Sequence, residues 1–260
     1  MNNAPVKETH APETDVVMPQ RRAAGVCLHI TSLPGPYGIG EIGRAARAFI
    51  DRMVAMELSV WQFLPLGPTA YGDSPYQPLS TFAGNEMLVD IDDLIDRGLL
   101  TDDEVGELTT LPERYVDYGT LIPVKWRLLY LAASRFEETV DADTLHDFNQ
   151  FLARMDDAWL HDYALFRVLK SNHGERPWPE WRPEFVHRDA TALARLEVQE
   201  ADRIRSLKII QYLFFQQWSL LRDYAHGRGA VSYTHLRAHE TRYVISYAVF
   251  CLKKGGGGGG

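Results

Sequence analysis

Two short apolar runs lie near the start of the chain, at residues 26–30 and 60–66. Each run ends in a loop crowded with Gly, Pro, Ser, Thr and Tyr. Between them, residues 43–57 place apolar side chains at helical spacing, with charged side chains on the other faces. This order predicts a βαβ unit of an α/β protein, in which loops at the carboxyl ends of parallel strands carry the functional side chains.

The rest of the chain, up to residue 229, carries mainly helical patterns. Thr101 followed by Glu104 is a capping-box signature that opens a short helix. Pro123 stands where a first helical turn accepts proline. The prolines within residues 177–185 exclude a helix throughout that stretch. We predict further helices over residues 94–99, 124–136, 190–224 and, as a helical pair or one bent helix, 143–169.

Composition is that of a globular protein with a sizeable core. The chain has 260 residues, of which 45% are hydrophobic and 24% charged, and its net charge of −8 disfavours nucleic acid as a partner. No apolar run approaches the roughly 20 residues that span a bilayer, and the first residues lack the apolar core of a signal peptide. The two cysteines indicate no disulfide framework. We therefore expect a cytoplasmic protein without a membrane partner.

The loop after the second predicted strand carries the most concentrated chemistry. Residues 71–77 read Tyr-Gly-Asp-Ser-Pro-Tyr-Gln, which brings two aromatic faces, a carboxylate, a hydroxyl and an amide together. Ring faces bind the apolar side of a pyranose, while carboxylates and amides hydrogen-bond its hydroxyls in pairs, so the loop is a candidate sugar site. The alternative is a structural turn, in which Asp73 and Ser74 bond the local backbone and Pro75 fixes the chain.

Several sequence words around this loop resemble those of the amylomaltase family, the 4-α-glucanotransferases of α-glucan metabolism. They are HITSLPGPYGIGEIG, WQFLPLGPTAYGDSPYQ and FAGN, in this order within residues 25–90. The resemblance returns at residues 210–229, IQYLFFQQWSLLRDYAHGRG, which look like the family helix before the next barrel strand. Pro78, Leu79 and Glu86 depart from the residues expected there.

The resemblance implies an α/β fold in which the chain is an incomplete TIM (β/α)8 barrel, made of the first strands, with a large helical insertion. A closed barrel of about 250 residues needs eight strands, and only two strands are convincing in this chain. We therefore expect a disordered leader over residues 1–22, a βαβ unit with the substrate loop over 23–90, a helical insertion subdomain over 91–207, a barrel helix over 208–229 and a non-native tail over 230–260.

By the same resemblance, the partner is an α-1,4-glucan or maltooligosaccharide substrate, which the loop binds. Tyr76 would offer a ring face to a glucose unit, while Asp73 and Ser74 would bond sugar hydroxyls or hold the loop. Tyr71 would lie at the edge of the cleft, and Gln77 supplies the amide of this substrate-binding set.

The resemblance also implies transfer of α-1,4-glucan segments between maltooligosaccharides by a retaining double displacement, without metal or organic cofactor. This reaction needs a carboxylate nucleophile and a carboxylic general acid/base about 5 Å apart. The family's catalytic carboxylates lie on later barrel strands, and no position here matches those motifs, so no catalytic residue is assigned. Two alternatives stay open for this polypeptide: a noncatalytic α-glucan-binding protein, and a truncated chain without activity of its own.

His29, at the end of the first predicted strand, is a further substrate-binding candidate. A lone histidine is more often a structural group, and that alternative stays open beside the binding role. The acidic and histidine residues elsewhere form no metal-ligand pattern.

Residues 38–43, Gly-Ile-Gly-Glu-Ile-Gly, match the GxGxxG dinucleotide fingerprint of an NAD-dependent oxidoreductase. Residues 31–37 separate the predicted strand from the first glycine, whereas the fingerprint needs the turn immediately after the strand. The second predicted strand also ends without an acid to hold the ribose hydroxyls. We therefore favour a glycine-rich turn into a helix over a cofactor site.

Composition changes abruptly from Val231 onward, and six consecutive glycines close the chain. His226, His235 and His239 lie near this change, and a functional interpretation would be a metal site followed by a linker. We favour a different interpretation, because the segment resembles a translated sequencing-library adapter that runs into poly-A and poly-G. On that basis the native protein ends near Gly229.

Overall fold

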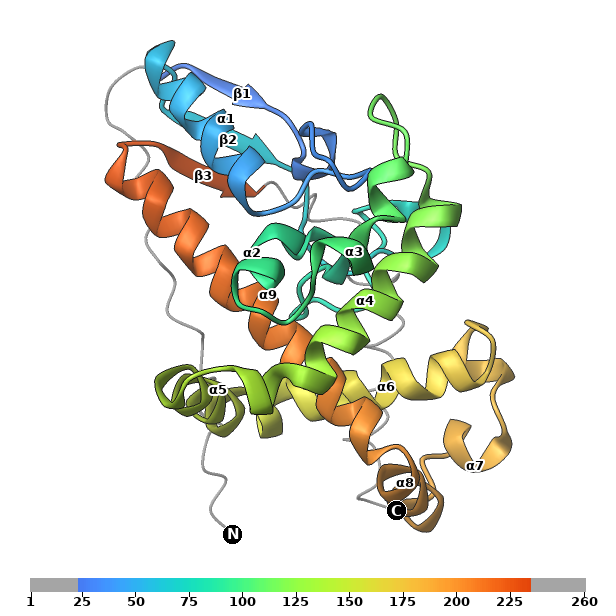
Figure 1. Ribbon diagram of the computed structural model, residues 1–260. Helices are drawn as coiled ribbons and strands as arrows, with labels where there is room; N and C mark the ends of the chain where they lie inside the picture. Colours follow the sequence, from blue (N-terminus) through green and yellow to red (C-terminus); the bar gives the residue numbers. More distant parts are fainter. Residues whose placement is uncertain (1–22, 235–260) are drawn as a thin grey trace, which may run out of the picture.

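A computed structural model describes residues 23–234 (Figure 1). Within this part, three short strands form one parallel sheet in the order β1-β2-β3. They are β1 (Gly25–Cys27), β2 (Val60–Phe63) and β3 (Val231–Thr234). Gly25 pairs with Val60, which in turn pairs with Val231, so the three strands begin at the same edge. The predicted parallel pair is confirmed, with both strands shorter than the apolar runs.

Strand β3 lies at the start of the segment that we expected to be a non-native tail. We expected residues 230–260 to be non-native, whereas β3 pairs along the whole of β2. The backbone amide of Val231 also donates to the carbonyl of Ser59 at 2.8 Å. The first residues of this segment therefore belong to the sheet. The remainder, residues 235–260, and the predicted leader, residues 1–22, lie outside the described residues.

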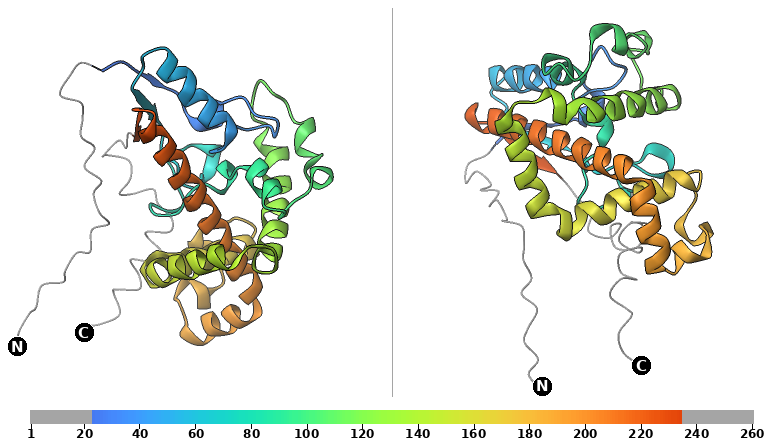
Figure 2. Two further views of the ribbon diagram at one scale, coloured as in Figure 1. Left: turned by 60° about the vertical axis from the view of Figure 1, so that its left-hand side comes forward. Right: turned by 60° about the horizontal axis from the view of Figure 1, so that its bottom comes forward.

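Two helices cover one face of the sheet. They are α1 (Arg44–Ala55), between β1 and β2, and α9 (Ala201–Gly227), which leads into β3 (Figures 1 and 2). Aromatic rings join the layers, because the ring centroid of Trp61 lies 4.9 Å from that of Phe49 on α1. The centroid of Phe63 lies 5.5 Å from that of Trp218 on α9. The amphipathic helix predicted over residues 43–57 is confirmed as α1.

The opposite face of the sheet is more open. Side chains alternate along a strand, so Val60 and Gln62 point away from the side that buries Trp61 and Phe63. Val60 and Gln62 are partly exposed, and Cys27, which pairs with Gln62, is exposed. Helices thus cover the sheet on one side only within the described residues.

The chain between β2 and α9 is helical, as the periodicity predicts. Figure 1 shows α4 beside α9, with α5 and α6 crossing below the sheet layer and α7 and α8 at the far end. The helices are α2 (Ile91–Asp96), α3 (Asp102–Val105), α4 (Tyr118–Thr139), α5 (Ala142–Met155), α6 (His161–Asn172), α7 (Pro183–Val186) and α8 (Ala190–Gln199).

Side-chain caps decide where two of these helices begin. The amide of Thr101 donates to Glu104 Oε2 at 3.0 Å, which confirms the capping box at α3. At α4, Asp117 Oδ1 accepts from the amide of Thr120 at 3.3 Å. This cap starts α4 earlier than expected, so Pro123 lies inside the helix and the prediction of a first-turn proline was wrong.

The two long helical patterns are interrupted. Residues 143–169 form α5 and α6, joined by a π-helical turn at Asp156–Leu160, which confirms the prediction of a helical pair or one bent helix. The run over residues 190–224 is divided at Glu200, where φ is −113°, and its second part continues to Gly227 as α9.

The glycines of residues 38–43 form a tight turn into α1, as favoured from the sequence. Gly38 has a φ of +73°, a conformation that glycine adopts most readily. A Cβ on Gly40 would lie 2.0 Å from the carbonyl oxygen of Ile30, and one on Gly43 would lie 2.0 Å from the Asp90 carboxylate. Close packing within the chain therefore explains this glycine spacing.

A buried ion pair joins this turn to α4. The Lys125 ammonium donates to Glu41 Oε1, and their side chains are 0% and 6% exposed. Glu41 Oε2 accepts from the amide of Ile91 at 3.1 Å, and Lys125 Nζ also donates to the Met87 carbonyl at 2.8 Å. The pair thus connects the turn before α1, the start of α2 and the middle of α4.

Candidate functional site

The loop that follows β2 is closed at its base by an isolated antiparallel bridge between Thr69 and Pro78. At its tip, Gly72 and Asp73 have φ values of 71° and 52°, in the left-handed region. Asp is among the few residues other than Gly that adopt this region without a large penalty, because its short polar side chain can hydrogen-bond the local backbone. The backbone therefore turns sharply at Gly72 and Asp73, and Asp73 is the loop residue that lines a cavity.

Ser74 holds the second half of the loop through local hydrogen bonds. Its Oγ accepts from the amide of Tyr76 at 3.3 Å, and its carbonyl accepts from the amide of Gln77 at 3.1 Å. This is the backbone role that the sequence offered for Ser74 as an alternative. Sugar binding by Ser74 stays a prediction.

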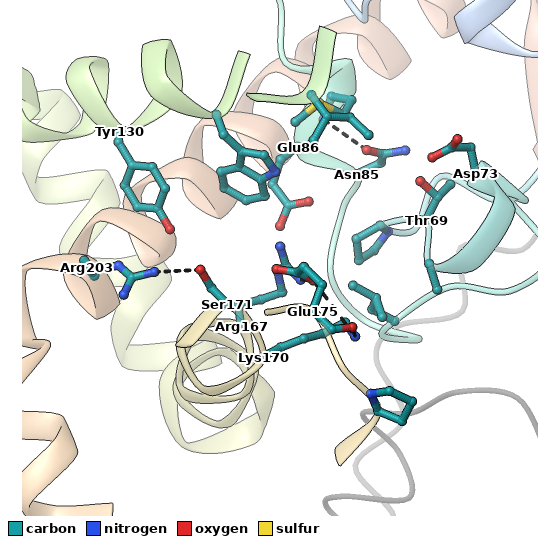
Figure 3. A pocket seen from close by; sticks show the side chains of 17 residues that line it. Thr69, Asp73, Asn85, Glu86, Tyr130, Arg167, Lys170, Ser171, Glu175 and Arg203 are labelled. Atoms are coloured by element: carbon teal, nitrogen blue, oxygen red, sulfur yellow. Dashed lines mark hydrogen bonds and ion pairs between the residues drawn. The ribbon is translucent and has the colours of Figure 1, made fainter. Parts of the chain in front are cut away.

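A cavity of about 660 Å³ lies between this loop, the segment that follows it, and helices α4, α6 and α9 (Figure 3). Its volume is within the roughly 300–1,000 Å³ of typical ligand sites. Of the predicted site residues, Asp73 lines it. The lining consists of Pro68, Thr69, Ala70, Asp73, Leu79, Asn85, Glu86, Met87, Ile122, Trp126, Tyr130, Arg167, Lys170, Ser171, Glu175, Pro177 and Arg203.

The other loop candidates do not line this cavity. Ser74 and Tyr76 are half-buried, and Gln77 is exposed. The structure describes only the backbone of Tyr71, at the start of the 3₁₀ turn Tyr71–Asp73. The structure therefore brings Asp73 into a cavity and leaves the remaining loop side chains around it, with their roles in binding still predictions.

His29 lies beyond the sheet, because β1 ends at Cys27, so its expected place at the end of a strand was wrong. It precedes the 3₁₀ turn Ile30–Ser32 and does not line the cavity. Its Nδ1 is buried without a hydrogen-bond partner. Burial lowers the pKa of His29 from 6.5 to about 4, because it disfavours the charged imidazolium.

This shift makes His29 a source of pH-dependent stability. The unfolded chain binds the proton more readily than the folded one, so the stability due to neutral His29 is present above pH 6.5 and lost as pH falls toward 4. Between pH 7 and pH 4 we expect the chain to lose about 1–2 kcal/mol more folding free energy than His29→Asn. Urea unfolding at both pH values measures this, with His226→Asn on the exposed side of α9 as the matched control. An equal pH dependence in the chain and in His29→Asn would contradict it.

Glu86 is a buried acid on the wall of the cavity, with only 3% of its surface exposed. Its Oε1 accepts from the Tyr163 hydroxyl at 2.6 Å and from Gln211 Nε2 at 3.0 Å. Burial raises its pKa, against the lowering effect of the Arg167 charge. The sequence singled out Glu86 as a departure from the family pattern but not as a site residue. The signal that could have found it is an acid inside the apolar run before α2.

Cationic side chains approach the cavity from α6 and α9. The Arg167 guanidinium lies 5.4 Å from the ring centroid of Trp126, and its Nη1 lies 3.3 Å from Glu175 Oε2. Arg203 Nη2 donates to Ser171 Oγ at 3.1 Å, a bond drawn in Figure 3. These residues come from helices far from the loop in sequence, so local sequence patterns could not place them beside it.

Two glutamines of α9 hold the segment that leads from the loop to α2. Gln211 donates to the carbonyl of Gly84 and accepts from its amide, both at 2.9 Å. Gln217 makes the same pair of bonds with the backbone of Asp90, at 2.8 and 3.3 Å. Buried polar groups need such partners, so α9 fixes Glu86 between two anchored points.

Membrane-spanning helices and clusters of metal ligands are absent from the part of the chain that the structure describes. No helix within residues 23–234 combines the length and apolarity needed to cross a membrane. In the same residues, no three His, Cys, Asp or Glu side chains gather where they could hold a metal ion.

Comparison with known proteins decides the family. The family model described as 4-alpha-glucanotransferase matches residues 28–232. The chain belongs to the 4-α-glucanotransferase family. The match also includes Val231 and Ser232, which agrees with their place in β3.

Individual relatives agree with this assignment. The chain is 42% identical over 208 residues to a 4-alpha-glucanotransferase of Thermus thermophilus, covering 80% of this chain and 41% of the relative. It is 36% identical to a chloroplastic/amyloplastic 4-alpha-glucanotransferase of Solanum tuberosum, covering 80% and 37%. The solved amylomaltase from Streptococcus agalactiae in complex with acarbose superposes with a TM-score of 0.76 at 34% identity, covering 82% of this chain and 43% of that one. The chain thus spans about two fifths of the length of these relatives.

Proposed function

We propose that this chain is the amino-terminal portion of an enzyme that transfers α-1,4-glucan segments between maltooligosaccharides by a retaining double displacement. The observation that carries the proposal is the family match over residues 28–232, which includes the loop and every residue that lines the cavity. The reaction needs two carboxyl groups about 5 Å apart across the scissile bond. We place them in the part of the relatives that this chain does not match.

The sheet supports an incomplete TIM barrel as the frame of this function. Its strands are parallel and adjacent in chain order, with α1 and α9 on one face. In a closed barrel, helices cover the outside while the inner strand faces pack on one another. The partly exposed Val60 and Gln62 lie on the face that would be inside. The helices between β2 and α9 form the proposed insertion.

The loop is the proposed place where this chain meets the glucan. Tyr76 and Tyr71 supply ring faces, and Asp73, Ser74 and Gln77 supply hydrogen-bonding groups for sugar hydroxyls. His29, on the neighbouring turn after β1, completes the proposed substrate-binding set. The support is that β1 and β2 end on the side of the sheet where the loop and the cavity lie, the side on which barrel enzymes carry their sites.

A chimaera tests the proposed function. Residues 23–232 would be joined to the remaining part of the Thermus relative at the matching position, and the conversion of maltotriose to glucose and longer maltooligosaccharides would be measured. We expect these products from the chimaera and none from the 260-residue chain alone. A folded chimaera that forms no products would overturn the proposal.

The loop is tested in the same chimaera with Tyr76→Ala. Loss of the Tyr76 ring face removes about 0.5–1.5 kcal/mol of binding, which lowers kcat/KM for transfer about two- to twelvefold. The thermal midpoint should stay within a few degrees, because Tyr76 is only half-buried. Tyr115→Ala, which removes a tyrosine that is 68% exposed, is the matched control. Kinetics unchanged by Tyr76→Ala would remove this residue from the site.

A further inference from the structure

His173 follows the last residue of α6 and forms hydrogen bonds through both of its ring nitrogens. Its Nδ1 lies 2.6 Å from the carbonyl oxygen of Leu169, and its Nε2 lies 3.2 Å from the amide nitrogen of Arg182. A carbonyl can only accept, so Nδ1 carries a proton, whereas an amide N–H can only donate, so Nε2 carries none. The two partners together therefore require a neutral His173 in the Nδ1–H tautomer.

The bond to Arg182 closes a loop between α6 and α7, which Figure 1 shows beyond the end of α6. Aromatic rings of the far side of this loop pack on the imidazole. The Trp181 ring is stacked on it, with centroids 5.3 Å apart and planes inclined by 19°, and the Phe185 ring meets it at 5.7 Å and 83°. The His173 side chain is therefore the join between α6 and the segment that leads into α7.

The loop that His173 closes carries part of the cavity wall. Glu175 and Pro177 both lie within it and both line the cavity. Glu175 Oε2 lies 3.3 Å from Arg167 Nη1, and the carbonyl of Glu175 accepts from Lys170 Nζ at 2.7 Å. Figure 3 shows Glu175 beside these two cations of α6. The position of the loop thus decides how the charged groups of this wall are arranged.

The backbone of the loop is strained at Glu175, where φ is +59°. A residue other than glycine keeps this conformation only where surrounding contacts hold it. The amide of Glu175 donates to the carbonyl of Lys170 at 2.9 Å, and Trp181 Nε1 donates to the carbonyl of Arg176 at 3.1 Å. The third contact that closes the loop is the bond to His173, and it is the one that needs an unprotonated nitrogen.

Protonation of Nε2 would turn this acceptor into a donor that faces the amide of Arg182, so the bond between them cannot persist. The bond from Nδ1 to the Leu169 carbonyl is kept, because both nitrogens of an imidazolium donate. The carbonyl end of α6 also favours a positive charge. The ring of His173 would therefore stay on α6 while the Arg182 side of the loop is released.

The charged neighbours of His173 are engaged elsewhere. Among the described residues, no carboxylate lies within ion-pair distance of its ring. Arg182 Nε lies 3.4 Å from Glu184 Oε1, and the Arg182 guanidinium lies over the Phe185 ring. The other charged or titratable side chains on α6, the loop, the 3₁₀ turn Trp178–Glu180 and α7 nearest the ring are Lys170, Glu175, Arg176, Glu180, His187 and Arg188.

We propose that His173 is a positioning residue that, in its neutral form, holds residues 174–177 against the cavity and releases them when Nε2 is protonated. His173 does not itself line the cavity, so it acts through Glu175 and Pro177. The inference goes beyond the proposed function and does not depend on it, because it rests on two hydrogen bonds to the backbone and on the ring contacts of His173.

Nuclear magnetic resonance of the 260-residue chain tests this proposal. Long-range proton–nitrogen spectra at pH 8 should show the Nδ1–H tautomer of His173. The pH is then lowered until this ring gains its second proton. In the same pH interval, we expect the hydrogen-exchange protection factor of the Arg182 amide to fall about tenfold, as befits the loss of one hydrogen bond. The protection of the Glu175 amide should fall with it, and the Trp181 Nε1–H resonance should shift.

Two variants separate the His173 ring from general effects of acid. In His173→Asn, the Arg182 amide should be weakly protected already at pH 8, with no further fall on acidification. His187→Asn removes an exposed histidine at the end of α7 and is the matched control, which should keep the pH profile of the parent chain. Thermal unfolding establishes that each variant is folded. If His173→Asn does not fold, the pH profiles of the parent chain and of His187→Asn still decide.

Three outcomes would overturn the proposal. One is an Nε2–H tautomer of His173 at pH 8. Another is protection of the Arg182 amide that does not follow protonation of this ring, which is the result that a purely structural histidine predicts. The third is loss of protection at Arg182 alone, with Glu175 still protected, because the loop would then be held by Lys170 without His173.

Discussion

Replacement of Lys125 by Met is expected to cost about 3–5 kcal/mol of folding free energy, because it leaves the buried Glu41 carboxylate without its counter-charge. Lys125 is fully buried, and it bonds both Glu41 and the carbonyl of Met87. That loss is a large fraction of the 5–15 kcal/mol that typically stabilises a domain. Urea unfolding at pH 7 measures it, and a loss below about 1 kcal/mol would contradict the prediction.

Two further variants give the Lys125 prediction its controls. Arg127→Met, two residues along α4, removes an ion pair whose partners are 61% and 54% exposed, and should cost less than about 1 kcal/mol. Lys125→Met combined with Glu41→Leu removes both charges and should recover much of the loss, since a buried pair can be replaced by apolar side chains.

The cost of Lys125→Met also depends on pH. Burial already raises the pKa of Glu41 to about 7, and loss of Lys125 raises it further. When the pKa of a carboxyl is higher in the folded state than in the unfolded state, the carboxyl contributes most to stability below the unfolded-state pKa. This contribution is lost as pH rises through the folded-state pKa. We therefore expect the variant to lose less at pH 5 than at pH 8.

This ion pair matters for the site as well as for the fold. Lys125 bonds the carbonyl of Met87, the residue next to Glu86, and Glu41 bonds the amide of Ile91. The same segment is held from its other side by Gln211 and Gln217 of α9. The wall of the cavity therefore depends on charges and amides that are themselves buried. Such groups fix a conformation more than they add net stability.

Local patterns in the sequence predicted the elements that are determined locally. The βαβ order, the amphipathic α1 and the Thr101 capping box follow from residues within one or two turns of each other, and each is confirmed. Pro123 was misplaced because Asp117, an effective cap before a weaker pattern, starts α4 earlier than the apolar spacing suggests. Strand β3 was not predicted because the abrupt change of composition led residues 230–260 to be interpreted as a non-native tail, while the pairing that places β3 is with β2, far back in the chain.

The cavity shows the same division between local and distant information. Asp73 could be predicted because a carboxylate in an aromatic loop is a local feature. Glu86, Trp126 and Arg167 come from three segments whose meeting depends on how α4, α6 and α9 pack. Neither the periodicity of apolar residues nor the spacing of motifs in the sequence specifies how these helices pack together. The one local sign of Glu86 is an acid inside an apolar run, which predicts a buried partner but does not identify that partner.

Gly84→Ala is expected to destabilise the chain by about 3 kcal/mol, the upper part of the range for overpacking a tight core. A Cβ at this position would lie 2.0 Å from the ring of Phe214 on α9, whose side chain is 2% exposed and has no room to move. To relieve the overlap, Gly84 must withdraw from α9. That movement would lengthen both hydrogen bonds between its backbone and Gln211, each now 2.9 Å.

Gly227→Ala is the matched control, because nothing lies within 4 Å of its added Cβ at the end of the same helix. Alanine favours a helix over glycine by up to about 1 kcal/mol, so this variant should be neutral or slightly stabilising in urea unfolding. Near-equal stability of the two variants would mean that the segment around Gly84 can shift at little cost and is not held rigidly by α9. A loss confined to Gly84→Ala would show that the contact with Phe214 fixes the segment that carries Glu86, which lies two residues from Gly84.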